Sequence, residues 1–338
     1  MKLTIRHSFS KLALVPAIGF VLLLIASVAQ ADPVVPGFTV QEYVTGIPDP
    51  MMLSFDSTGA LFVGRQNTEY LSGGGNPYRV APRGASFTGY GNSGFHDPDA
   101  VLVDSTGVIS GTAGSVLVGG SGFNYAGYIQ AILPDSSVST VFGPSNTYTN
   151  PSDMTFDSAG RFLFTDVRIG EVYASTGSNP TLLFSDPAIP VNIVTNESNQ
   201  ILTGDMDGTI RIWNSDGTLA NGSFATGMNN GFNYGVSLAF GPGGVWGHDL
   251  YAMANHSLYR FDSLGHGTII GTGFTGPPQD MTFGPDGSLY VSVQTENRIL
   301  QITPSPAAVP EPSSFALLGL GGIGLAIGAY HRRRIAVV

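Results

Sequence analysis

One pattern recurs along the chain and constrains its fold more than any other feature. It consists of a proline, two variable residues, an apolar–any–apolar triplet and a turn. It reads PMMLSFDSTG (50–59), PDAVLVDSTG (98–107), PSDMTFDSAG (151–160), PVNIVTNESN (190–199) and PPQDMTFGPDG (277–287), with a copy lacking the proline, GVSLAFGPGG (235–244). Successive copies lie 39 to 53 residues apart. Units of this length are typical of the blades of a β-propeller, and six copies predict six blades.

The local pattern within each unit indicates β-hairpins. A short alternating run precedes an Asp/Gly turn, and a second alternating run follows it, as in FLFTD (162–166) and SLYVSV (288–293). Apolar spacing with a period of two on both sides of such a turn is typical of a hairpin. A third run often follows, such as TIRIW (209–213) or RILQI (298–302). The body shows no sustained 3.6-residue period, so we predict an all-β fold with essentially no helix.

Other β architectures explain the repeat less well. A β-solenoid also stacks hairpins, but its repeats are usually shorter than about 40 residues, and two β-sandwiches would not explain the unit length. A closed ring must also avoid an open sheet edge. The last unit ends near Thr303 with three strands, while FTVQEYV (38–44) precedes the first unit without a partner. We therefore predict that 38–44 forms the outer strand of the sixth blade.

The repeat also resembles that of a known group of propellers. The NHL and gluconolactonase-like six-bladed propellers carry units with P-x-x-apolar followed by D-x-x-G, and the resemblance spans residues 38–303. It implies a six-bladed ring, and it implies function far less, since one fold supports many functions.

The N-terminus has the features of a secretory signal peptide. Lys2, Arg6 and Lys11 precede an apolar stretch (12–28), and the small residues Ala29 and Ala31 form an A-x-A cleavage site. We predict a signal peptide over 1–31 that is removed by signal peptidase, with an uncleaved anchor helix as the alternative.

The C-terminus contains a second apolar segment. Residues 314–330 are 17 positions without a charge, about 26 Å of helix, so we predict a transmembrane helix slightly short of a ~30 Å hydrocarbon core. Arg332, Arg333 and Arg334 follow it and would remain cytoplasmic, which leaves the body on the periplasmic side of the inner membrane.

Together with Pro310, Glu311 and Pro312, this tail resembles the PEP-CTERM sorting signal of Gram-negative bacteria that make exopolysaccharide. The resemblance covers about the last 30 residues. It implies recognition by an exosortase, which would cleave near Pro-Glu-Pro and release the protein to the outer envelope or extracellular matrix. A plain C-terminal anchor is the alternative. The expected organisation is thus signal peptide (1–31), propeller (32–309) and sorting segment (310–338).

The charge of the predicted propeller excludes one class of partner. Residues 32–309 contain eight arginines, no lysine and 23 acidic residues, a net charge of −15. Such a surface repels phosphates, so we expect no nucleic-acid binding. The chain has no cysteine, so no disulfide framework stabilises it.

Polar residues at one repeat position are candidate metal ligands. Asp153, Asn192 and Asp280 directly precede the apolar triplets, where inner strands begin, and could converge on a hard cation such as Ca²⁺. Asp99, with His96 and Asp97 nearby, could add to that rim. The alternative is that these side chains cap turns and bind backbone groups.

The resemblance to calcium-dependent lactonases implies ligands immediately after the proline, at Met51, Asp99, Ser152, Val191, Val236 and Gln279. Only Asp99 among them could serve, which weakens the hydrolase interpretation. No catalytic residue is predicted.

Two further segments allow more than one interpretation. DMDGTIRIW (205–213) begins like a calcium loop but lacks its downstream acid, so a tight hairpin turn is expected. The stretch 67–96 resembles an insertion between units, with rings at Tyr70, Tyr78, Phe87 and Tyr90 that could stack on sugars or cover a blade edge.

The sequence as a whole predicts an exported cell-envelope or matrix protein that is processed by an exosortase. Its propeller would be a non-enzymatic binding or structural module for exopolysaccharide or an envelope protein. The alternative is an exported Ca²⁺-dependent lactonase or esterase acting at the channel.

Overall fold

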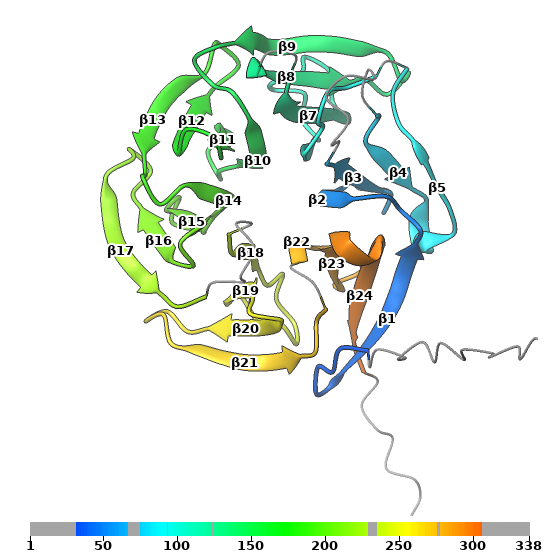
Figure 1. The fold of residues 1–338 in the computed structure, drawn as a ribbon, viewed down its shortest axis with the longest axis vertical. Coiled ribbons are helices and arrows are strands. Elements are labelled where there is room, and N and C mark those ends of the chain that lie inside the picture. Colours follow the sequence, from blue (N-terminus) through cyan, green and yellow to red (C-terminus); the bar gives the residue numbers. More distant parts are fainter. Residues whose placement is uncertain are drawn as a thin grey trace, which may run out of the picture. The chain divides into compact units, whose positions relative to one another are not determined.

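The computed structural model describes residues 32–305, except 67–74, 93, 123–124, 229–234 and 276–277. The strands in this part form six four-stranded antiparallel sheets, which Figure 1 shows as blades around a common centre. The all-β, six-bladed propeller predicted from the repeat is confirmed. Each blade's innermost strand contains the apolar triplet of one repeat unit.

The blades follow the order of the chain. Blade 1 contains β2 (Pro50–Phe55), β3 (Leu61–Arg65), β4 (Tyr78–Val80) and β5 (Phe87–Gly89), and blade 2 contains β6 (Ala100–Asp104), β7 (Ser115–Ser121), β8 (Gly127–Ile132) and β9 (Val138–Ser145). Blade 3 contains β10 (Pro151–Phe156), β11 (Phe162–Asp166), β12 (Glu171–Ser175) and β13 (Thr181–Ser185), and blade 4 contains β14 (Pro190–Thr195), β15 (Ile201–Asp205), β16 (Ile210–Trp213) and β17 (Leu219–Ala225). Blade 5 contains β18 (Ser237–Phe240), β19 (Leu250–Ala254), β20 (Ser257–Phe261) and β21 (Gly267–Thr272). Blade 6 contains β22 (Pro278–Phe283), β23 (Leu289–Val293), β24 (Arg298–Pro304) and, from the other end of the chain, β1 (Phe38–Thr45).

The hydrophobic core is divided among the joints between blades. Six clusters of buried apolar side chains are present, and each combines residues of two neighbouring blades. In the joint between blades 2 and 3, for example, Leu117 and Ile129 pack with Phe162 and Phe164. Burial of apolar surface therefore stabilises the contact of each blade with the next, as well as each sheet.

The ring closes as predicted. β1 pairs antiparallel with β24, with Phe38 opposite Pro304 and Val40 opposite Ile302. Ahead of β1, Val34 forms an isolated bridge to Thr272 in blade 5, with N···O distances of 2.9 and 3.0 Å. The residues that follow the predicted signal peptide thus pair through their backbone with blades 5 and 6.

The strands that the structure describes within 67–96 belong to blade 1, so the expectation of an insertion was wrong. They are β4 and β5, the third and fourth strands of that blade. These strands are only three residues long, too short to show an alternating pattern. The ring of Tyr78 meets Phe87 edge-on, with centroids 5.4 Å apart, so these two aromatic side chains pack within the blade. Tyr70 lies outside the described residues.

Helix is scarce in the part of the chain that the structure describes. It is limited to short 3-10 turns such as η1 (Pro82–Gly84) and η3 (Gln294–Glu296). Across the same residues, no helix is both long and apolar enough to span a bilayer. The predicted signal segment (1–31) and the predicted membrane helix (314–330) lie outside the described residues.

Candidate functional site

A cavity of about 380 Å³ occupies the centre of the ring. The inner strands of all six blades, β2, β6, β10, β14, β18 and β22, contribute to its wall. The lining extends from Asp153 and Asp280 to Phe156 and Phe283, which are the last residues of β10 and β22. Two carboxyl groups therefore lie at one end of the cavity, and the ends of the inner strands lie at the other.

Asp153 and Asp280 occupy equivalent positions in opposite blades. β10 and β22 face each other across the centre of the ring in Figure 1. Asp153 Oδ2 accepts a hydrogen bond from the backbone N–H of Ile193 in blade 4 (2.8 Å), and Asp280 Oδ2 accepts one from Leu53 in blade 1 (2.8 Å). Each carboxyl group thus connects its own blade to the next.

Their remaining oxygens also have partners. Asp153 Oδ1 accepts the N–H of Met154 at 2.7 Å, and Ser237 Oγ lies 3.5 Å from Asp280 Oδ1, to which it donates. Burial raises the pKa of Asp153 to about 7. Burial and the nearby charge of Asp153 raise the pKa of Asp280 well above its ordinary value. At neutral pH the pair therefore carries less than two full negative charges.

Asn192 is the third residue of the predicted metal set. Its side chain is in blade 4, directly before Ile193, and only 1% of the residue is exposed. Neither its amide oxygen nor its amide nitrogen has a hydrogen-bond partner within the described part of the chain. Asn192 is not among the residues that line the central cavity. A buried amide without partners is nevertheless costly, which makes this side chain the strongest indication of a ligand-binding position on the inner strands.

Asp99 lies in a different environment. It is buried, and both its burial and the charge of Asp97 raise its pKa well above the ordinary value. Burial, together with the charges of Asp99 and Asp97, raises the pKa of Tyr128, whose hydroxyl donates to the His96 carbonyl oxygen (2.5 Å). Asp99 is absent from the lining of the central cavity, whereas Asp153 and Asp280 are present there. Over the described ranges, no group of three or more His, Cys, Asp or Glu side chains is placed to hold a metal ion.

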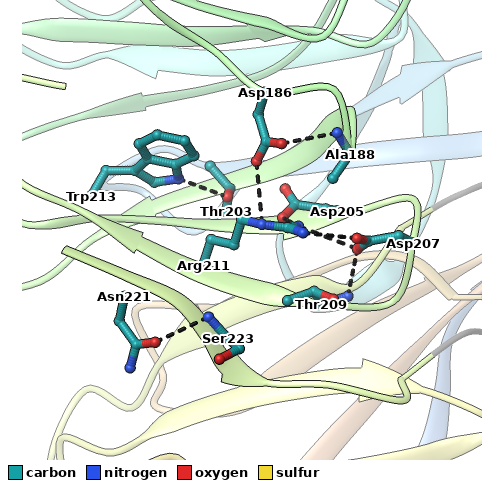
Figure 2. A network of polar contacts seen from close by, with 10 residues as sticks. All are labelled: Asp186, Ala188, Thr203, Asp205, Asp207, Thr209, Arg211, Trp213, Asn221 and Ser223. Atoms are coloured by element: carbon teal, nitrogen blue, oxygen red, sulfur yellow. Dashed lines mark hydrogen bonds and ion pairs between the residues drawn. The ribbon is translucent and has the colours of Figure 1, made fainter. Parts of the chain in front are cut away.

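The turn at 205–208 adopts the predicted hairpin and is surrounded by acids. Figure 2 shows the guanidinium of Arg211 among three carboxylates. Its nitrogens lie 2.5 Å from Asp205, 2.8 Å from Asp207 and 3.6 Å from Asp186. Burial raises the pKa of Asp205 to about 7, although Arg211 opposes the shift. The Arg211 side chain thus supplies the positive charge that balances the carboxylates around this turn.

The sequence did not indicate which residues of the second strand pair with Asp153, Asn192 and Asp280 in their blades. Gly204 lies opposite Asn192, Thr165 opposite Asp153 and Ser292 opposite Asp280. The Thr165 hydroxyl donates to the Val191 carbonyl oxygen in the next blade (3.1 Å). The only sequence signal is a small residue at this position of several units, which is weak in a chain with 46 glycines.

Comparison with known families bears on the tail of the chain. A family model described as the PEP-CTERM protein-sorting motif matches residues 308–334. The chain carries a PEP-CTERM sorting motif. The matched stretch includes Pro-Glu-Pro (310–312) and the three arginines (332–334), as predicted. The motif implies an exported protein that an exosortase processes at the membrane.

Solved structures similar to this chain share its fold. A gluconolactonase from Xanthomonas campestris is 13% identical, with 80% of this chain and 90% of that chain covered and a TM-score of 0.59. A virginiamycin B lyase from Staphylococcus aureus is 14% identical, with coverages of 79% and 99% and a TM-score of 0.53. The PQQ domain of a pyranose dehydrogenase from Coprinopsis cinerea is 10% identical, with coverages of 80% and 97% and a TM-score of 0.52.

These identities support the fold alone, and the activities named for the three proteins differ. The resemblance to gluconolactonase-like propellers is therefore confirmed at the level of architecture. No curated protein has significant sequence similarity to the chain.

Proposed function

We propose that the mature protein is a component of the cell envelope or extracellular matrix, and that its propeller is a non-enzymatic binding or structural module. Its expected partners are exopolysaccharide or another envelope protein. Before processing, the C-terminal segment anchors the chain in the inner membrane with the propeller on the periplasmic side. Signal peptidase and an exosortase then remove the two terminal segments.

The observation that supports this proposal most strongly is that the carboxyl oxygens of Asp153 and Asp280 accept hydrogen bonds from the protein itself. A catalytic carboxylate must reach a substrate, a proton or a metal ion with an accessible oxygen. Three of the four carboxyl oxygens of Asp153 and Asp280 instead accept backbone N–H groups, two of which come from a neighbouring blade. The fourth oxygen accepts a hydrogen bond from the Ser237 hydroxyl. This arrangement suits a structural connection between blades.

The test compares binding with turnover in the processed protein, purified from the producing bacterium. We expect it to sediment with the extracellular polysaccharide of that bacterium, and we expect no hydrolysis of lactones or esters with or without CaCl₂. Ca²⁺-dependent turnover that disappears in both Asp153→Asn and Asp280→Asn, with the melting temperature unchanged, would contradict the proposal. Absence of the protein from both envelope and matrix fractions would contradict it equally.

A second candidate is a Ca²⁺-dependent hydrolase at the channel, and the unpartnered amide of Asn192 favours it. The fit to Ca²⁺ is poor, because this ion takes six to eight oxygen ligands and the carboxyl oxygens nearby already accept N–H groups. Titration with CaCl₂ separates the candidates. A hydrolase requires a rise in melting temperature that Asn192→Ala abolishes, and a structural channel predicts no rise.

A further inference from the structure

A groove outside the channel lies where the ring closes. This groove, of about 540 Å³, runs between the β1 strand, the first turn of blade 1, the η1 turn and the first turn of blade 6. We call it the seam groove. The lining side chains used below are Gln41, Tyr43, Phe55, Arg83, Asp286 and Gln301. Its volume is within the range of small-molecule sites in proteins.

Arg83 distinguishes this groove from the rest of the surface. The propeller contains eight arginines. Seven of them contact a carboxylate or an aromatic ring: Arg161, Arg211, Arg260 and Arg298 form ion pairs, and Arg65, Arg79 and Arg168 lie over rings. Within the described residues, Arg83 has neither kind of contact and its side chain is exposed. A free guanidinium is notable on a domain with a net charge of −15.

The backbone holds Arg83 in an unfavourable conformation. Its φ is +68°, and Gly84 follows at +70°. A non-glycine residue in this region costs on the order of 1 kcal/mol. A Cβ at Gly84 would lie 1.9 Å from the Tyr43 carbonyl oxygen, so the η1 turn rests directly on β1. This contact fixes the backbone beside Arg83, which lines the groove.

Other lining residues present polar groups in fixed orientations. Gln301 Nε2 donates to Asp286 Oδ2 (3.0 Å) and to the Tyr290 hydroxyl (2.8 Å), and Gln41 Nε2 donates to Gln301 Oε1 (2.7 Å). Asp286 and Gln41 are both exposed. A preordered set of hydrogen-bonding groups loses little entropy when a ligand binds.

Three aromatic side chains also line the groove. The ring of Tyr290 meets Tyr43 edge-on at 4.8 Å between centroids and Phe55 at 4.7 Å. Tyr43 and Tyr290 are buried, while Phe55 is partly exposed. Pro82 and Pro285 contribute further apolar surface to the lining. The groove thus combines one apolar surface, several hydroxyl-binding groups and one unpaired guanidinium.

We propose that the seam groove binds an acidic sugar unit, a hexuronate within a polysaccharide chain. The planar guanidinium of Arg83 matches a carboxylate with two parallel hydrogen bonds. Asp286 and Gln41 bind hydroxyl groups, and the apolar face of the pyranose packs on Phe55. This inference rests on the proposed function as a binding module and names its ligand class and its site.

The test uses the processed protein and two forms of one oligosaccharide, tetragalacturonate and its methyl ester, in calorimetric titrations at about 0.15 M salt, where acidic residues more than about 8 Å from the ligand are screened. We expect tetragalacturonate to bind and the ester, which lacks the charge, to bind at least tenfold more weakly. Arg83→Gln should cause a similar loss. Arg83→Gly should cause the same loss while raising the melting temperature, because glycine relieves the strain at this φ. Arg168→Gln, at an exposed arginine over the Tyr125 ring, is the matched control and should bind like the wild type.

Three results would overturn the inference: no binding of tetragalacturonate, equal binding of the ester, or unchanged binding in both Arg83 variants. None of them affects sedimentation of the protein with matrix polysaccharide, so failure of the seam groove is distinguishable from failure of the proposed function.

Discussion

Asp104 and Asp153 belong to successive units of the repeat and use their carboxylates in different ways. Asp104 accepts N–H groups from Gly107 (2.8 Å), Ile109 (3.0 Å) and Ser110 (2.8 Å), all within its own loop. Asp153 reaches Ile193 in the next blade. The first residue therefore stabilises local structure, and the second stabilises the assembly of blades. Residue type alone does not distinguish the two roles.

The raised pKa values in the channel predict how stability depends on pH. A carboxyl group with a folded pKa above its unfolded value favours the folded state at low pH, and this contribution is lost as the pH rises through the folded pKa. For Asp153 that pKa is about 7. We therefore expect the melting temperature to fall between pH 5 and pH 8, and we expect Asp153→Asn to reduce this fall. Scanning calorimetry of both proteins across the range measures it.

Asp216→Asn is the control, because that carboxyl group is fully exposed and hydrogen bonds from Thr218 lower its pKa. It should leave the fall between pH 5 and pH 8 unchanged. A fall of the same size in Asp153→Asn would show that this channel carboxyl group does not carry the effect.

Gly204 permits close approach of two blades. A Cβ at this position would lie 1.8 Å from the Val236 carbonyl oxygen in blade 5. We expect Gly204→Ala to destabilise the fold by about 3 kcal/mol, because backbone rather than a flexible side chain must move. The control is Gly222→Ala in the outer strand of the same blade, where the nearest atom is a Leu219 methyl carbon at 3.4 Å. Equal urea midpoints for the two variants would refute this role.

At the scale of elements, the inner strands were predictable from sequence and several outer strands were not. Inner strands are buried, so their apolar positions follow the hairpin period. The outer strand β17 is exposed over most of its length, and β4 and β5 are too short to show a period. This is the physical reason that 67–96 resembled an insertion. The closing strand β1 was predictable because a ring needs a partner for its last edge.

The candidate site was only partly predictable for a related reason. The repeat places Asp153 and Asp280 at equivalent positions of two inner strands, so their approach to the channel could be expected. Their hydrogen bonds depend on which N–H groups the next blade presents, which a repeat pattern does not encode. The seam groove was beyond sequence reasoning, because Gln41, Arg83 and Asp286 are distant in the chain and become neighbours only when β1 closes the ring.

Removal of the closing strand tests its role. We expect a chain that lacks residues 32–45 to lose cooperative folding or to associate, since β24 becomes an open edge. It also loses the ring contact between Phe38 and Trp246, whose centroids lie 4.2 Å apart. A shorter deletion of 32–36, which retains β1, should cost less. Size-exclusion chromatography and thermal melts compare the two. A monomer with an unchanged melting temperature after the longer deletion would refute the role of the strand.

At the scale of the whole molecule, both ends of the propeller leave the ring at the same blade. Phe38 pairs with Pro304, and the N–H of Ser305 donates to the Gly37 carbonyl oxygen at 3.0 Å. The strands end before residue 306. The proposed cleavage near Pro-Glu-Pro would therefore leave every blade intact.

The most direct test of this account is intact-mass and terminal-peptide analysis of the protein from membrane, envelope and medium fractions. We expect the exported form to begin at Asp32 and to end near residues 310–314. Glu311→Ala, or replacement of Arg332–Arg334 by alanine, should leave unprocessed protein at the inner membrane. An exported form that still extends to Val338, or normal maturation in both variants, would contradict the account.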